Sequence, residues 1–192
     1  MKPKNAAEKF SSFLALAKAR VSTYEFNKEL VTEKDVLKIL EAGRWAPSCS
    51  NLQPWHFIVV KNHKRIKELM MCANYGDFHT DPPLLIALVL LQRCCPTPNF
   101  SCFPVDLKVN DAFMCLGMAA LSMAFEAQDL GVDSCFLTPL QAEAKKILRV
   151  SGEDTVPLIL GLGHSRQGAF QKPRARKELS EIISYEHFRG KK

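Results

Sequence analysis

The residues best suited to bind a polar ligand lie in one short elbow between an expected helix and an expected strand. Within Trp45–Val60, WAPSCSNLQPWHFIVV, the segment Pro47–Asn51 offers two hydroxyls, a thiol, an amide and several backbone N–H groups. Ser and Asn favour turns because their side chains also hydrogen-bond to nearby backbone. The elbow can therefore bind a polar heterocycle, and an ordinary polar turn is the alternative interpretation.

Cationic side chains near both ends of the chain suit an anionic ligand. Arg20 and Ser22 place a guanidinium and a hydroxyl two residues apart, so that both can reach one phosphate. Near the other end, five basic residues crowd one stretch: Arg166, Lys172, Arg174, Arg176 and Lys177. This cluster suits a phosphate-bearing ligand, with a solvated basic loop or a nucleic-acid surface as alternatives. No nucleic-acid motif is visible, which disfavours the last of these.

The seven cysteines are odd in number and irregularly spaced. Because the N-terminus MKPKNAAEKF lacks the apolar core of a signal peptide, we expect free thiols in a cytoplasmic protein. Cys94, Cys95 and Cys102 lie in the proline-rich segment 92–105, which cannot be regular structure. A metal site there is an alternative, but no C-x-x-C pair supports it. Cys115 lies in a long apolar segment and is expected to pack rather than react.

Apolar periodicity and turn residues predict the elements that position these groups. Strands are expected over residues 56–60, 84–91, 132–137 and 156–163. Helices are expected over residues 6–18, 63–74 and 106–130. Another helix should begin at a Thr32 cap and end before Pro47, and a last one should follow a Thr138 cap, with Pro139 at its first helical position. A chain of 192 residues with 47% hydrophobic content predicts one domain over residues 1–192. No apolar run approaches the roughly 18 residues that span a membrane.

Two segments indicate a second copy of the chain. The stretch 106–130 is apolar nearly all round, which predicts a buried helix, and its small residues allow another helix to approach closely. It is therefore our candidate for a dimer core. The tail from Lys172 to Phe188 is too small to form its own core, and we expect it to embrace a neighbouring subunit.

Three segments resemble the FMN-dependent nitroreductase family. APSCSNLQPWHFIVV is similar to its APS-x-x-N-x-QPW-x-F segment, and Ala19–Phe26 to its RRS-hydrophobic-R-x-F entry. LILGLGHS followed by KPRARKEL resembles the family's late strand and K-x-R phosphate clamp. The order and spacing agree from about residue 10 to 188. The resemblance implies an α+β, three-layer fold with a central, mainly antiparallel sheet flanked by helices, and a C-terminal strand contributed across a homodimer.

The same resemblance implies the FMN-binding residues. It assigns the phosphate to Arg20, Ser22, Lys172 and Arg174, with Arg176 as the alternative to Arg174 and with Val21 contributing backbone. It places Pro47, Ser48, Cys49 and Asn51 along the pyrimidine edge, partly across the subunit boundary, and Leu137, Thr138 and Pro139 against the ring. Tyr24 departs from the family pattern, because a basic residue is common at that position.

The activity implied is ping-pong hydride transfer from NADH or NADPH through flavin N5 to a small electron-poor acceptor, such as a nitroaromatic or a quinone. The cofactor carries the chemistry, so no catalytic side chain and no metal are expected. Dehalogenation, flavin fragmentation and a non-enzymatic flavin-binding redox sensor remain alternatives. The expected partners are a second copy of the chain, with FMN at the interface, and the small-molecule acceptor, not nucleic acid or membrane.

Overall fold

The computed structural model describes residues 10–73, 80–91, 107–169 and 174–188. The strands are β1 (Trp55–Val60), β2 (Leu84–Leu90), β3 (Asp133–Leu137) and β4 (Thr155–Gly163). The helices are α1 (Phe13–Ala19), α2 (Glu33–Arg44), the 3₁₀ turn η1 (Cys49–Asn51), α3 (His63–Ala73), α4 (Leu107–Asp129), α5 (Gln141–Leu148) and α6 (Leu179–Ile182). The expected segment 92–105 and Lys172 lie outside the described residues.

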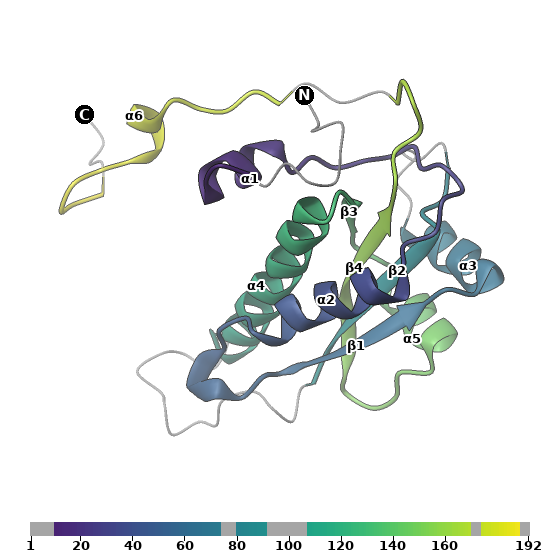
Figure 1. Cartoon of the computed structure of the whole chain (residues 1–192). Coiled ribbons are helices and arrows are strands. Elements are labelled where there is room, and N and C mark those ends of the chain that lie inside the picture. The colour runs from purple at the N-terminus through teal and green to yellow at the C-terminus, as the bar shows by residue number, and fades with distance from the viewer. Residues whose placement is uncertain (1–9, 74–79, 92–106, 170–173, 189–192) are drawn as a thin grey trace.

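The four strands form one antiparallel sheet in the order β1-β2-β4-β3 (Figure 1). Every residue of β2 is buried, which confirms the central strand predicted from its continuous apolar run. Such a strand must be covered on both faces, because its side chains alternate between them.

Helices cover both faces of the sheet and give three layers. Leu84, Ile86, Leu88 and Leu90 of β2 pack with α2 and α4 on one face, whereas Leu85, Ala87 and Val89 pack with α3 and α5 on the other. Figure 1 shows the two helical layers on opposite sides of the strands. The predicted α+β fold with a central antiparallel sheet is therefore confirmed.

The start of α2 was predicted correctly. Thr32 is its N-cap, and its Oγ1 accepts a hydrogen bond from the Asp35 backbone N–H at 3.2 Å. Glu33 and Asp35 lie in the first turn, where negative charge stabilises the positive end of the helix. Leu37 of this helix and Trp45, which follows it, are exposed although both side chains are apolar.

The predicted start of α5 was wrong. Leu140, not Thr138, is the N-cap, and the helix begins at Gln141. The Leu140 N–H donates to the Cys72 carbonyl, and the Gln141 side chain hydrogen-bonds to both backbone groups of Val156. Contacts with α3 and β4 therefore hold the preceding turn out of the helix.

The long helix was predicted at the right place, but it is not buried all round in one chain. Phe113, Met114, Met118 and Leu121 of α4 are exposed, while Leu116, Ala120, Met123 and Ala124 are buried. Helix α1 also begins later than expected, at Phe13, because the Ser12 side chain caps it by accepting from the Ala15 N–H.

Residues 174–188 run along the outside of the molecule and contain only the short helix α6 (Figure 1). They form no strand with the sheet of their own chain, so the expected exchange of a C-terminal strand remains a prediction. In the described ranges, no helix combines the length and the hydropathy that a membrane span requires.

Candidate functional site

Arg20 is the centre of a cationic cluster at the end of α1. Its backbone N–H still donates to the Leu16 carbonyl, so the side chain leaves the last turn of the helix at a fixed point. The guanidinium is half-buried and lies over the Phe136 ring, 5.9 Å from its centroid. Its Nη1 atom is buried and, within the described part of the chain, has no hydrogen-bond partner.

Two further arginines come from the other end of the chain. Burial lowers the pKa of Arg20, and the positive charges of Arg174 and Arg176 lower it further, whereas Tyr24 opposes them. The Arg174 Nη1 atom donates to the Lys18 carbonyl at 2.8 Å, which fixes the tail beside the end of α1. The charges of Arg174 and Arg176 are therefore close enough to act on the partly dehydrated guanidinium of Arg20.

The segment after Arg20 is held against the sheet by isolated backbone bridges. Ser22 forms a parallel bridge with Ser134 of β3, and the Thr23 N–H donates to the Ser134 carbonyl at 3.1 Å. Farther on, Phe26 pairs with Ser165 just beyond β4. Backbone pairing thus fixes where Arg20, Val21, Ser22 and Tyr24 lie.

Arg166 does not belong to this cluster, contrary to the grouping made from the sequence. Its Nε and Nη2 atoms donate to one carboxylate oxygen of Glu25, at 3.1 and 2.5 Å. The Glu25 side chain is only 8% exposed, so burying its charge requires such a partner. Arg166 therefore fastens the segment 20–27 to the end of β4. No feature of the sequence alone pairs two residues so far apart.

The elbow is a 3₁₀ turn with an unusual backbone. Ser50, Asn51 and Gln53 have φ values of 49°, 56° and 49°, in the left-handed region. Such a conformation costs roughly 1–3 kcal/mol for each non-glycine residue unless surrounding contacts determine it. The Ser48 Oγ atom accepts from the Gln53 N–H at 3.0 Å, which supports the turn.

The side chains of the elbow remain largely available. Pro47 and Asn51 are exposed, and Ser48 and Cys49 are half-exposed. The Cys49 backbone N–H donates to the Sγ atom of Cys115, 3.3 Å away, so the elbow rests on α4.

The third predicted segment follows β3. Leu137 and Pro139 are buried and Thr138 is exposed. Thr138 lies four residues beyond Ser134, about 13 Å along the chain. The turn is thus displaced along the sheet from the arginine cluster.

The elbow and the arginine cluster lie toward opposite ends of α4 (Figure 1). Phe13 of α1 packs edge-on against Phe125, with ring centroids 5.0 Å apart, whereas Cys49 contacts Cys115. The ten residues between these contacts correspond to about 15 Å of helix. One chain therefore brings Arg20, Arg174 and Arg176 together but does not bring the elbow to them.

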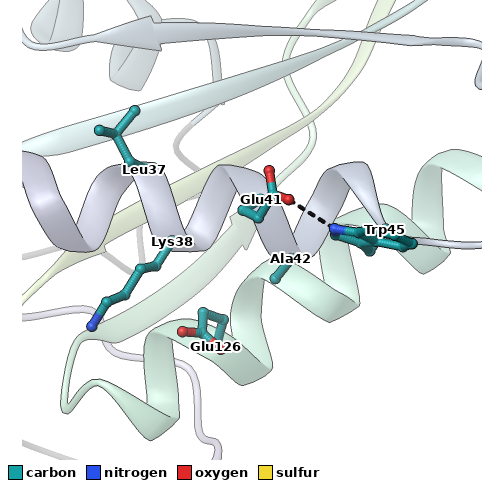
Figure 2. Close-up of a pocket in the computed structure, with 6 residues that line it drawn as sticks. All are labelled: Leu37, Lys38, Glu41, Ala42, Trp45 and Glu126. Carbon is teal, nitrogen blue, oxygen red and sulfur yellow. Dashed lines mark hydrogen bonds between the residues drawn. The ribbon is translucent and has the colours of Figure 1, made fainter.

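A surface hollow of about 520 Å³ between α2 and α4 is a different feature (Figure 2). Its lining residues are Leu37, Lys38, Glu41, Ala42, Trp45 and Glu126. The indole N–H of Trp45 donates to Glu41 at 2.7 Å, and burial together with Asp129 raises the pKa of Glu126. The hollow contains no predicted site residue, and its two carboxylates make it unsuited to a phosphate.

A model described as the Nitroreductase family matches residues 17–78. A curated relative from Archaeoglobus fulgidus, whose name gives NADH dehydrogenase and NAD(P)H nitroreductase, is 31% identical over 124 residues, which are 65% of this chain and 66% of that protein. A second curated relative with the same name, from Methanothermobacter thermautotrophicus, is 33% identical over 111 residues, which are 56% of this chain. The aligned regions span about 66% and 58% of the lengths of these two relatives.

Solved structures share the fold. A nitroreductase family protein from Clostridium difficile superposes with a TM-score of 0.78 and 23% identity, over 92% of this chain and 99% of that one. A structure from Desulfovibrio desulfuricans, described as a nitroreductase in complex with FMN, has a TM-score of 0.74 and 23% identity, over 92% and 97% of the two chains. The fold, the family match and the curated relatives agree, and the chain belongs to the nitroreductase family.

Proposed function

We propose that this protein is an FMN-dependent oxidoreductase that takes hydride from NADH or NADPH and delivers it to a small electron-poor acceptor. The observation that carries the proposal is the half-buried Arg20 guanidinium, whose Nη1 atom is buried without a hydrogen-bond partner among the described residues and whose pKa is lowered by the nearby charges of Arg174 and Arg176. The names of the relatives support the donor and the reaction class, and the FMN complex of the D. desulfuricans protein supports the cofactor.

The cluster fits the phosphate of FMN. Like charges around a half-buried position repel one another, and a buried N–H without an acceptor is costly. A phosphate dianion would remove both costs, because it supplies negative charge and several strong acceptor oxygens. We therefore assign the phosphate to Arg20, Ser22, Arg174 and Arg176, with Lys172 as a further candidate outside the described residues.

The remaining predicted residues would hold the rest of the cofactor. Tyr24 and the backbone of Val21 adjoin the phosphate position along the segment paired with β3. The turn Leu137–Pro139, farther along the same strand, is placed to line the ring, since the ribityl chain of FMN separates ring from phosphate. The chain's part is to bind and orient the flavin and to shape the space above it.

The pyrimidine edge would be supplied by a second copy of the chain. The Pro47–Asn51 elbow lies too far along α4 to complete the arginine cluster of its own chain, and the exposed face of α4 offers an apolar surface for association. That face consists of Phe113, Met114, Met118 and Leu121. We propose a homodimer in which Pro47, Ser48, Cys49 and Asn51 of each subunit face the flavin of the other.

When bound, FMN would supply an N5 atom that accepts hydride from the nicotinamide and passes it to the acceptor in a ping-pong cycle. Nitroaromatics and quinones suit this chemistry because they are electron-poor. Anaerobic mixing of the FMN-loaded protein with NADH and with NADPH tests the proposal: flavin absorbance should bleach and return when an acceptor is added. Protein that binds FMN without bleaching would instead be a flavin-binding module.

The phosphate assignment is tested by Arg20→Ala. Losing one charge-assisted contact should weaken FMN binding by roughly 1.5–3 kcal/mol, or about 10- to 150-fold in Kd. Titration of the apoprotein with FMN, followed by quenching of flavin fluorescence, measures the change. Arg44→Ala is the matched control, since Arg44 is an exposed arginine that pairs with Glu41 on α2. Equal affinities for both variants would place the phosphate elsewhere.

A further inference from the structure

Cys49 of the elbow and Cys115 of α4 are two cysteines in contact, through the backbone N–H of the first and the sulfur of the second. Both are free, Cys49 half-buried at the surface and Cys115 buried in the core with 3% exposure. The Cys49 N–H donates to Cys115 Sγ at 3.3 Å. The described cysteines elsewhere, Cys72 and Cys135, lie in the opposite helical layer and the sheet, where burial raises the pKa of each thiol and disfavours the reactive thiolate.

The spacing suits a disulfide. Standard bond lengths and the direction of the N–H···S contact place the two Cα atoms no more than about 7 Å apart. Disulfides span Cα separations of about 4.4–6.8 Å. Bonding the two sulfur atoms requires the elbow to move toward α4 and the Cys49 side chain to rotate, because its Sγ atom now lies 3.9 Å from the Oγ atom of Ser50.

The elbow can make such a movement more easily than the helix can. Ser50 and Asn51 are exposed, and Ser50, Asn51 and Gln53 all occupy the left-handed region, which is strained for residues other than glycine. By contrast, Cys115 lies in the middle of a 23-residue helix packed against the sheet. Cys49 is thus the reachable and movable thiol, and Cys115 is the fixed thiol beneath it.

We propose that Cys49 and Cys115 form an oxidative modification site for a hydroperoxide. The Cys49 thiolate attacks one peroxide oxygen, so that an S–O bond forms and the O–O bond breaks, giving a sulfenic acid and, with hydrogen peroxide, one water. The Cys115 sulfur then attacks the Cys49 sulfur; the S–S bond forms, the S–O bond breaks, and a second water leaves with the thiol proton. Two thiols are oxidised and one peroxide is reduced to two waters.

The disulfide draws Cys49 toward α4 and replaces the N–H···S contact that now holds the elbow. Its effect on flavin rests on the proposed function, in which Cys49 faces the cofactor of the partner subunit. On that basis the oxidised protein binds FMN more weakly, and a reducing agent restores the affinity. The disulfide itself is independent of any flavin.

The test is graded oxidation of the full-length protein with hydrogen peroxide, followed by mass spectrometry without reduction. The expected result is a loss of about 2 Da and a cross-linked peptide pair containing Cys49 and Cys115, both reversed by dithiothreitol. Cys72→Ser is the matched control and should cross-link like the wild type. Cys49→Ser and Cys115→Ser should each abolish the cross-link.

Oxidation of Cys49 to a sulfinic acid, or its pairing with Cys94, Cys95 or Cys102, would overturn the proposal, as would an unmodified Cys49 under conditions that oxidise Cys72. The wild-type peptide map decides among these results even if a variant does not fold. A Cys49–Cys115 cross-link that leaves FMN affinity unchanged would support the modification site and overturn only the assigned contact between the elbow and flavin.

Discussion

At the scale of single residues, charge and burial separate two arginines that look alike in the sequence. Arg166 meets a buried carboxylate of its own chain, so its charge is already compensated. Arg20 meets two more arginines and an aromatic ring, and its buried Nη1 has no partner in the described ranges. Arg166 is therefore a structural side chain, whereas Arg20 is the side chain that an incoming anion would stabilise.

The role of Arg166 predicts a stability effect. Arg166→Ala leaves the Glu25 carboxylate buried without its partner, which should lower the free energy of unfolding by about 1–3 kcal/mol. The range is modest because the Arg166 side chain is 62% exposed and partly screened by solvent. Urea denaturation of the apoprotein measures the loss.

The double variant Glu25→Gln/Arg166→Ala is the check on that explanation. Replacing the carboxylate by a neutral amide should recover part of the lost stability, because the buried charge that Arg166 compensates is then absent. If the double variant is as unstable as the sum of the two single variants, the two side chains are not coupled.

At the scale of elements, the pair α2 and α4 forms the helical layer that connects the elbow with the rest of the core. The two helices approach closely at Gly43, where an added Cβ would lie 2.1 Å from the Cε atom and 2.8 Å from the Cγ atom of Met123. Gly43 is buried and Met123 is fully buried. Gly43 lies in the last turn of α2, and a glycine within a helix is normally unfavourable, so close packing is the physical reason for this one.

Gly43→Ala should therefore destabilise the protein, although alanine is the better helix former. Displacing the buried Met123 side chain should cost about 1–3 kcal/mol, as in other overpacked cores. Chemical denaturation measures the change. In a Met123→Ala background the same substitution should cost much less, and an equal cost in both backgrounds would contradict the proposed clash.

At the scale of the whole molecule, one chain leaves half of the predicted site unfinished. The arginine cluster and the elbow lie toward opposite ends of α4, and the outer face of that helix is apolar and exposed. Exposed apolar side chains continue along the tail at Leu179, Ile182, Ile183, Tyr185 and Phe188. Exposed apolar side chains in these two places indicate association, which would also bring an elbow to each arginine cluster.

Met114→Arg tests the association. Burying an unpaired charge in an apolar interface costs several kcal/mol. Because roughly 1.4 kcal/mol corresponds to a tenfold change in Kd, the dimer should weaken by about two orders of magnitude or more. Sedimentation velocity over a range of protein concentrations measures the change, and FMN affinity should fall with it. Met71→Arg is the matched control, because Met71 is an exposed methionine on α3 in the opposite layer.

If Met71→Arg dissociates the protein and Met114→Arg does not, the subunits associate through the other layer. A dimer that dissociates without any loss of FMN affinity would show that each chain binds its flavin alone.

The sequence by itself determined the features that depend on local chemistry. Apolar periodicity was sufficient to predict the strands of the sheet and the helices α2, α3 and α4. The Thr32 cap could also be predicted, because its hydrogen bond joins residues only three positions apart. The start of α5 could not be predicted, because Leu140 donates to the carbonyl of Cys72 and Gln141 hydrogen-bonds to the backbone of Val156, both distant in the chain.

Only the tertiary structure decided how the charged and reactive groups are paired. It assigned Arg166 to Glu25, brought Arg174 and Arg176 to Arg20, set Cys115 beneath Cys49, and separated the elbow from the arginines. These relations join residues far apart in the chain, and they depend on burial, which no short stretch of sequence contains. Local hydrogen bonds and side-chain periodicity depend on residues that are close in the sequence. Charge compensation between distant residues exists only once the chain has folded.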